Sequence, residues 1–283
     1  MELWEAMEQR HSVRAYQNRP IAGEVKEELE AWIAQCNREG GLHMQLILDE
    51  PRAFSGGMAR YGKFSGVRNY IAVVGPKGPG LEEACGYYGE KVVLKAQQLG
   101  LNTCWVALTY RKVKTAFTVA PGEKLCLVIT IGYGKTAGQP HQGKPPEAVM
   151  QCPEPVPNWF LHGVQAALLA PTAMNQQKFR FQLEGSVVRA TPGRGFYTKI
   201  DLGIAKYHFE LGAAPTPFTW GRIPPNKTSR PPWGPAGLCL REGGQSKATP
   251  GKYSSTKSTR STVQVRPLRG SRQPASVVKR KVS

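Results

Sequence analysis

Residues 10–14, with the sequence Arg10-His11-Ser12-Val13-Arg14, bring together side chains that proteins use to bind phosphate. Arginine offers forked donors that match phosphate oxygens, and serine adds a short neutral donor. The preceding residues are an acidic and apolar stretch of helical character, so a charged helix end that faces water is the alternative interpretation. The residues alone leave both a phosphate site and a solvated helix end open.

A second polar segment, Ala170–Gln177, follows an apolar helical run over 164–169 that breaks at Pro171. Thr172, Asn175 and Gln177 supply a hydroxyl and amides, and amides both donate and accept hydrogen bonds. Such groups can meet the mixed donor and acceptor edge of an isoalloxazine ring. The alternative is a helix-terminating turn in which Thr172 and Asn175 satisfy backbone groups.

Together the two segments resemble the flavin-binding segments of the nitroreductase family. In that family each flavin mononucleotide (FMN) lies between an Arg/Ser-rich segment of one subunit and a Pro-Ser/Thr-x-x-Asn loop of the other. This chain carries one copy of each. The resemblance implies the internally duplicated, single-chain type, in which two fused halves form a pseudo-dimer that binds one FMN. It assigns the FMN phosphate and ribityl chain to Arg10, His11, Ser12 and Arg14, and the flavin ring to Pro171, Thr172, Asn175 and Gln177.

Three further residues stand where the family places groups near the flavin. Lys63 would lie near the pyrimidine end of the ring and favour the anionic reduced flavin, and Lys144 would point at the phosphate. A solvated surface lysine is the alternative for each. Ala107 would present its backbone N–H near flavin N5, although many relatives carry Glu-Gly where this chain has Ala107-Leu108.

The activity implied by the resemblance is hydride transfer from NAD(P)H to FMN, followed by reduction of a small-molecule acceptor such as a nitroaromatic compound or a quinone. No side chain has to act as a nucleophile, because the flavin does the chemistry. The five histidines and six cysteines show no metal-binding spacing, so no metal is expected. The competing hypothesis is a non-catalytic flavin-binding or degenerate fold whose basic tail binds nucleic acid or anionic surfaces.

Most of the net charge of +18 belongs to residues 221–283, which hold 14 Lys and Arg against the single acid Glu242. This segment is rich in Gly, Pro, Ser and Thr and lacks hydrophobic periodicity, so a disordered tail is predicted. Nucleic acid binding is expected only through this tail. No apolar run approaches the length of a membrane span, and no signal peptide is evident. We therefore expect a cytoplasmic monomer that makes no membrane contact.

Hydrophobic periodicity predicts core-facing helices over 25–36 and 81–99. Short runs rich in β-branched and bulky apolar residues predict strands at 43–48, 70–74, 103–108 and 125–131. Helices and strands mix without strict alternation, which indicates an α+β fold with a mixed sheet under long helices. The predicted organisation is a first nitroreductase-like half over 1–135, a connector over 136–154, a second half over 155–220 and the tail over 221–283.

A weak internal repeat supports two halves. QQLGLNTCW ends at Trp105 and FELGAAPTPFTW ends at Trp220, and each places Leu-Gly at the end of an apolar helix. The stretch 32–48 can also be laid against 159–183, with about eight residues missing from the first at the position of the Pro-Thr-x-x-Asn loop. The letters alone leave duplication and coincidence equally open.

Overall fold

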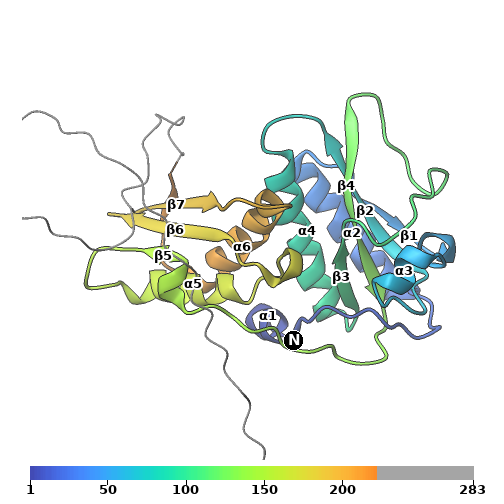
Figure 1. The fold of residues 1–283 in the computed structure, drawn as a ribbon, viewed down its shortest axis with the longest axis horizontal. Coiled ribbons are helices and arrows are strands. Elements are labelled where there is room, and N and C mark those ends of the chain that lie inside the picture. Colours follow the sequence, from blue (N-terminus) through green and yellow to red (C-terminus); the bar gives the residue numbers. More distant parts are fainter. Residues whose placement is uncertain (222–283) are drawn as a thin grey trace, which may run out of the picture. The chain divides into compact units, whose positions relative to one another are not determined.

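The computed structural model describes residues 1–221 (Figure 1). The helices and strands are, in chain order, α1 (Leu3–Gln9), α2 (Gly23–Gly40), β1 (Gln45–Ile47), α3 (Gly57–Tyr61), β2 (Asn69–Pro76), α4 (Leu81–Gln98), β3 (Asn102–Val106), β4 (Glu123–Gly132), β5 (Met150–Gln151), α5 (Asn158–Leu168), β6 (Phe179–Glu184), β7 (Val187–Pro192), α6 (Thr198–Ala213) and β8 (Thr219–Trp220). The predicted tail over 221–283 lies, apart from its first residue, outside the described residues.

The first sheet has the order β1-β2-β4-β3, and all its pairs are antiparallel. In β2 every residue but the last is buried, because both faces of the strand are covered. Ile71 and Val73 face the cluster formed with α2 and α4, whereas Tyr70 and Ala72 pack against a second cluster that includes Phe54. The continuous apolar run in the sequence reflects this double coverage.

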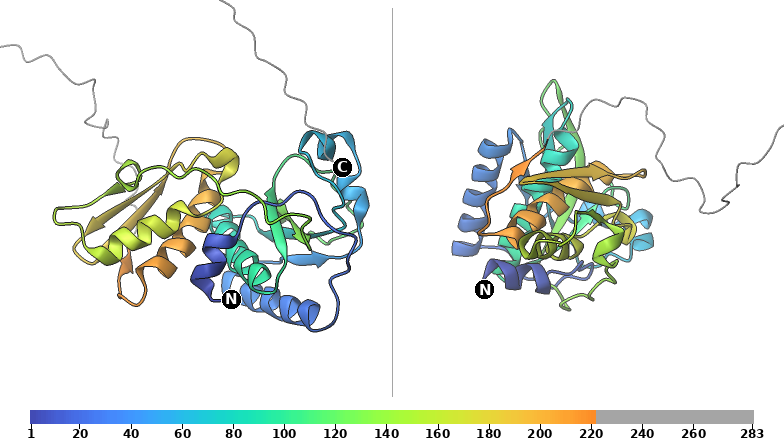
Figure 2. Two further views of the ribbon diagram at one scale, coloured as in Figure 1. Left: turned by 90° about the horizontal axis from the view of Figure 1, so that it is seen from below. Right: turned by 90° about the vertical axis from the view of Figure 1, so that its left-hand side faces the viewer.

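The second sheet has the order β5-β6-β7-β8, with β6 and β7 antiparallel and the two outer pairs parallel. Burial alternates along β6, as expected of a strand with one face on the core. Phe181 on that face stacks on Phe209 of α6, with ring centroids 4.7 Å apart. Helices α5 and α6 run side by side along the sheet (Figure 2).

Helices α4 and α6 cross at a pair of glycines. A Cβ atom at Gly86 would overlap the backbone carbonyl of Ile200, and one at Gly203 would overlap the carbonyl of Glu83. The two backbones therefore touch directly, which only glycine allows. This contact joins the helix of the first sheet to the helix of the second, and a single core cluster extends over both.

We expect Gly86→Ala to lower the free energy of unfolding by about 1–3 kcal/mol, because the added methyl group must push the helices apart. The measurement is urea unfolding followed by circular dichroism. Gly56→Ala is the matched control, since a Cβ atom at Gly56 would meet nothing within 4 Å. Equal stability of the Gly86 variant and the wild type would show that the crossing relaxes without cost.

Apart from α3, which lies between β1 and β2, the order α2, β1, β2, α4, β3 recurs as α5, β6, β7, α6, β8. In both series a helix precedes an antiparallel strand pair, and a long helix with Leu-Gly near its end follows. The series differ in their sheets, because β4 separates β2 from β3 whereas β8 pairs directly with β7. The matching order favours the predicted duplication, which stays a prediction.

The α+β class and the helices and strands expected in the first half are confirmed. The strands form two four-stranded sheets where a mixed sheet was expected, and only the second sheet mixes directions. The strand predicted at 103–108 ends at Val106, so Ala107 lies in a bend. The connector over 136–154 also contributes β5, because Met150 pairs with Phe181.

Candidate functional site

Residues 10–14 run along β3 as an added edge segment. Ser12 forms a parallel bridge with Thr103, and the Val13 N–H donates to the Thr103 carbonyl at 3.0 Å. Side chains alternate in an extended segment, so Arg10, Ser12 and Arg14 share one side. Burial raises the pKa of the Cys104 thiol, against the lowering effects of Arg14, Ser12 and Arg10. The three predicted side chains therefore lie on the side of the segment where Cys104 lies.

The Arg10 guanidinium is buried, with 3% of the side chain exposed, and its pKa is lowered by desolvation. Its nearest carboxylate oxygen is Glu90 Oε1, 3.8 Å from Nε, which is too long for a hydrogen bond. Nε is fully covered and has no hydrogen-bond partner within residues 1–221. Arg10 is therefore a buried cation with unused donors.

Glu90 of α4 is the centre of a buried polar network. Its Oε2 accepts from Trp105 Nε1 at 3.0 Å, and its Oε1 lies 2.9 Å from His208 Nε2 on α6. The other ring nitrogen of His208 lies 3.1 Å from the Ala166 carbonyl on α5. Neither Glu90 nor His208 has any exposed surface. The network links Arg10 to α4, α5 and α6.

The loop that follows α5 holds the second predicted segment in a constrained conformation. Met174, Asn175 and Gln177 all have positive φ, between 44° and 52°. The Gln177 amide donates to the Gln142 carbonyl and to Asn175 Oδ1, and its oxygen accepts from the Lys144 N–H. Strained non-glycine residues persist where surrounding contacts fix them, and they concentrate at functional sites.

Lys144 closes this loop from the connector. Its Nζ donates to the carbonyls of Gln176 and Gln177, at 2.8 and 3.0 Å. The Thr172 hydroxyl accepts from the Gln177 N–H at 3.1 Å. The predicted residues Lys144, Thr172, Asn175 and Gln177 therefore lie together, with Pro171 next to them in the chain.

Asp201, in the first turn of α6, binds the same loop through two hydrogen bonds. Its carboxylate accepts from the Ala173 N–H at 3.0 Å and from Gln176 Nε2 at 2.7 Å. Burial raises the pKa of Asp201 to about 6, against the lowering effect of these two hydrogen bonds. No motif or spacing in the sequence singles out Asp201.

The connector joins the two sets of predicted residues. Gly138 lies against His11, His141 Nε2 is 2.8 Å from the Leu168 carbonyl, and the Gln142 carbonyl accepts from Asn175 and Gln177. No hydrogen bond or ion pair within residues 1–221 joins residues 10–14 directly to the loop residues 171–177. The predicted residues thus form two clusters, a first cluster of Arg10, His11, Ser12 and Arg14 and a second cluster of Lys144, Pro171, Thr172, Asn175 and Gln177. One stretch of the connector lies between them.

The other two predicted residues lie outside these clusters. Lys63 is exposed, has a φ of 59° and follows α3. Ala107 follows β3, and its backbone N–H donates no hydrogen bond within the described part of the chain. A free N–H at this position is the group that the flavin N5 contact would require.

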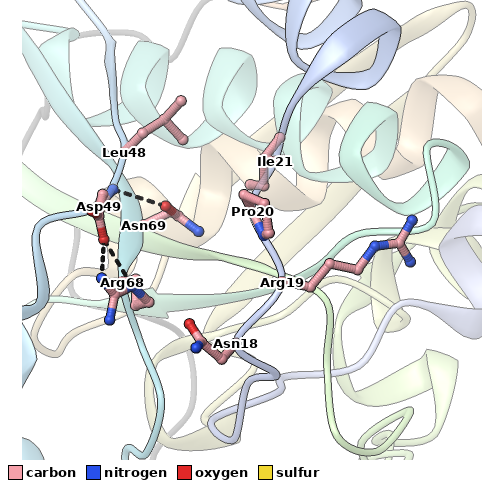
Figure 3. A pocket seen from close by; sticks show the side chains of 8 residues that line it. All are labelled: Asn18, Arg19, Pro20, Ile21, Leu48, Asp49, Arg68 and Asn69. Atoms are coloured by element: carbon pink, nitrogen blue, oxygen red, sulfur yellow. Dashed lines mark hydrogen bonds and ion pairs between the residues drawn. The ribbon is translucent and has the colours of Figure 1, made fainter.

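A cavity of about 250 Å³ lies elsewhere, where the segment after Tyr16 meets β1 and β2 (Figure 3). Its lining residues are Asn18, Arg19, Pro20, Ile21, Leu48, Asp49, Arg68 and Asn69. Its charged groups are already engaged, because Arg68 pairs with Asp49 and Arg19 lies over the ring of Tyr133. None of the residues predicted from the sequence lines this cavity, and we attach no function to it.

Two features of the sequence could have revealed the Glu90 network. Glu90 is the one acidic residue among the buried positions of α4, and Gly86 precedes it by one turn on the same side. A glycine at that spacing allows a close helix contact, which would bury the carboxylate. His208 stands in the apolar run of α6 and gives no comparable signal.

Within residues 1–221 no helix is both long and apolar enough to cross a membrane. The same residues contain no cluster of three or more His, Cys, Asp or Glu side chains that could hold a metal ion.

The comparisons with known proteins agree on one family. Residues 2–213 match the model of the family described as "Putative TM nitroreductase". A nitroreductase structure from Thermotoga maritima MSB8 is similar, with a TM-score of 0.55 and 25% identity over 75% of this chain and 83% of that chain. An FMN-dependent nitroreductase from Clostridium difficile R20291 has a TM-score of 0.39 and 16% identity over 46% of this chain and 87% of its own. No curated protein matches the chain.

The family model includes the long helices α2, α4 and α6 and most of both sheets, from α1 to the end of α6. The similarity to the Thermotoga maritima structure extends over the same fold. Because the match covers most of its length, the chain belongs to the TM nitroreductase family.

Proposed function

We propose that this protein is an FMN-dependent oxidoreductase that passes electrons from NAD(P)H to a small-molecule acceptor such as a nitroaromatic compound or a quinone. Membership of the nitroreductase family supports the reaction class. The observation that carries the cofactor is Arg10, whose buried Nε has no hydrogen-bond partner in the described part of the chain. A buried cation without a paired acceptor is costly, and a phosphate group bound at the Arg10 guanidinium would offset that cost.

The other members of the first cluster fit the same ligand. Ser12 and Arg14 lie on the side of the segment that Arg10 occupies, and Arg14 is exposed. They would bind the phosphate and the ribityl chain of FMN together with Arg10. His11 is half-buried, and burial and the charge of Arg10 lower its pKa. We therefore assign His11 a neutral contact with this part of the cofactor.

The second cluster would hold the ring. Asn175 is exposed, and Pro171 and Thr172 are half-buried, so all three can contact a ligand. Gln177 is buried and its amide is already used within the loop, which suits a residue that holds Asn175 in place. The free N–H of Ala107 would face N5. When bound, FMN supplies the hydride chemistry, and the chain binds and orients it.

We expect one FMN per chain and a monomeric protein, because each flavin-binding segment occurs once and α4 and α6 already pack on one another. Flavin released by heat, measured by absorbance against protein concentration, gives the ratio, and analytical ultracentrifugation gives the mass. Two equivalents of tightly bound FMN would contradict the pseudo-dimer.

Anaerobic titration tests the proposed activity. The purified protein should be yellow, lose its flavin absorbance when NADH or NADPH is added, and regain it when a nitroaromatic compound or a quinone follows. A protein that binds FMN but is reduced by neither nicotinamide would instead favour the non-catalytic flavin-binding hypothesis. A protein that binds no flavin would overturn the proposal.

A further inference from the structure

The hydrogen bonds of the buried His208–Glu90 pair determine how many protons the His208 ring and the Glu90 carboxyl group carry together. The two ring nitrogens of His208 lie 2.9 Å from Glu90 Oε1 and 3.1 Å from the Ala166 carbonyl. A carbonyl oxygen only accepts, so the nitrogen facing Ala166 carries a hydrogen. The contact with Glu90 then also needs one proton, either on the ring nitrogen or on the carboxyl group. In both cases the pair has a net charge of zero.

The remaining neighbours of Arg10 leave its charge without a counterion. Trp105 donates to Glu90 as a neutral group. Burial raises the pKa of the Cys104 thiol and that of Tyr207, which lies near Glu90, so both stay protonated at neutral pH. Burial and Arg10 lower the pKa of His11, which keeps that ring neutral. Arg10 is therefore the one uncompensated charge of this buried group.

We propose that His208 neutralises Glu90 and thereby keeps the charge of Arg10 available for an anionic ligand, which on the proposed function is the phosphate of FMN. Without His208, Glu90 would be a carboxylate 3.8 Å from Arg10 in a buried site, where charge interactions are only weakly screened. Arg10 would then be paired inside the protein and would attract a phosphate less. His208 acts through Glu90 and Arg10 and does not touch the ligand.

The experiment compares the affinity for FMN with that for riboflavin, which has no phosphate, by quenching of flavin fluorescence. The preference for FMN is the ratio of the affinity for FMN to the affinity for riboflavin. We expect His208→Gln to lower this ratio about tenfold. Glu90→Gln removes the negative charge itself and should leave the preference at or above that of the wild type. The double variant His208→Gln/Glu90→Gln should restore it, because the carboxylate that competes for Arg10 is gone. His162→Gln, at an exposed position of α5, is the matched control.

A folded His208→Gln variant with the wild-type preference would overturn the inference. A reduced preference in Glu90→Gln would also overturn it, because Glu90 would then be needed to hold Arg10 in place. Should circular dichroism show that His208→Gln does not fold, the Glu90→Gln variant alone tests the inference. A preference for FMN at or above that of the wild type supports it, and a lower preference overturns it. A wild-type protein that binds FMN no better than riboflavin would contradict the role of Arg10 itself, and one that binds neither would overturn the proposed function.

Discussion

Arg10→Ala should weaken FMN binding by about ten- to a hundredfold, because it removes charge-assisted hydrogen bonds to the phosphate that are worth about 1.5–3 kcal/mol. Riboflavin binding should barely change, since riboflavin has no phosphate. Both dissociation constants can be measured by fluorescence titration of the apoprotein. The difference between the two ligands separates loss of a phosphate contact from general damage to the fold.

Asn175→Ala is the contrasting variant, because Asn175 belongs to the cluster assigned to the ring. It should weaken FMN and riboflavin alike, through the lost side-chain contact and through release of the strained loop. If Arg10→Ala left FMN affinity unchanged while Asn175→Ala abolished it, the segment 10–14 would serve only the internal network around Glu90. The two flavin segments would then not form one site.

The sequence predicted the first half well because its signals are local. The stripes of α2 and α4 report burial on a regular period, and the apolar runs of β2 and β4 report burial on both faces; the structure confirms these four elements. The two-residue strand β8 is harder to find, because its residues are set by pairing across the sheet rather than by a period of their own. Cross-strand partners far apart in the chain leave no local pattern.

In the candidate site, too, the residues with a local signal could be predicted and those defined by distant contacts could not. Arg10 and Asn175 stand in short segments of unusual composition, so the sequence could single them out. The contacts that decide what these residues can do are non-local: Glu90 and His208 are separated by more than a hundred positions, and Asp201 reaches back to the loop at Ala173. Charge balance in a buried site depends on such contacts, and a list of residue types does not contain them.

The ionisation of Asp201 should make stability depend on pH. Its pKa is 3.8 in the unfolded chain and about 6 in the folded protein, because burial disfavours the carboxylate. Between these values the folded protein keeps a proton that the unfolded chain has released, so stability falls as pH rises through this window. The full cost of about two pKa units, or about 3 kcal/mol, applies above pH 6 and vanishes below the unfolded value.

Asp201→Asn removes this titration and retains an oxygen that can accept from the Ala173 N–H. The variant should therefore gain stability relative to the wild type as pH rises from 4 to 7, by up to about 3 kcal/mol. Urea unfolding at several pH values measures this difference, with Glu24→Gln at the exposed start of α2 as the control that follows the wild type. A stability difference that stays constant with pH would show that Asp201 ionises without cost. The loop that carries Asn175 would then rest on an ordinary hydrogen-bonded carboxylate.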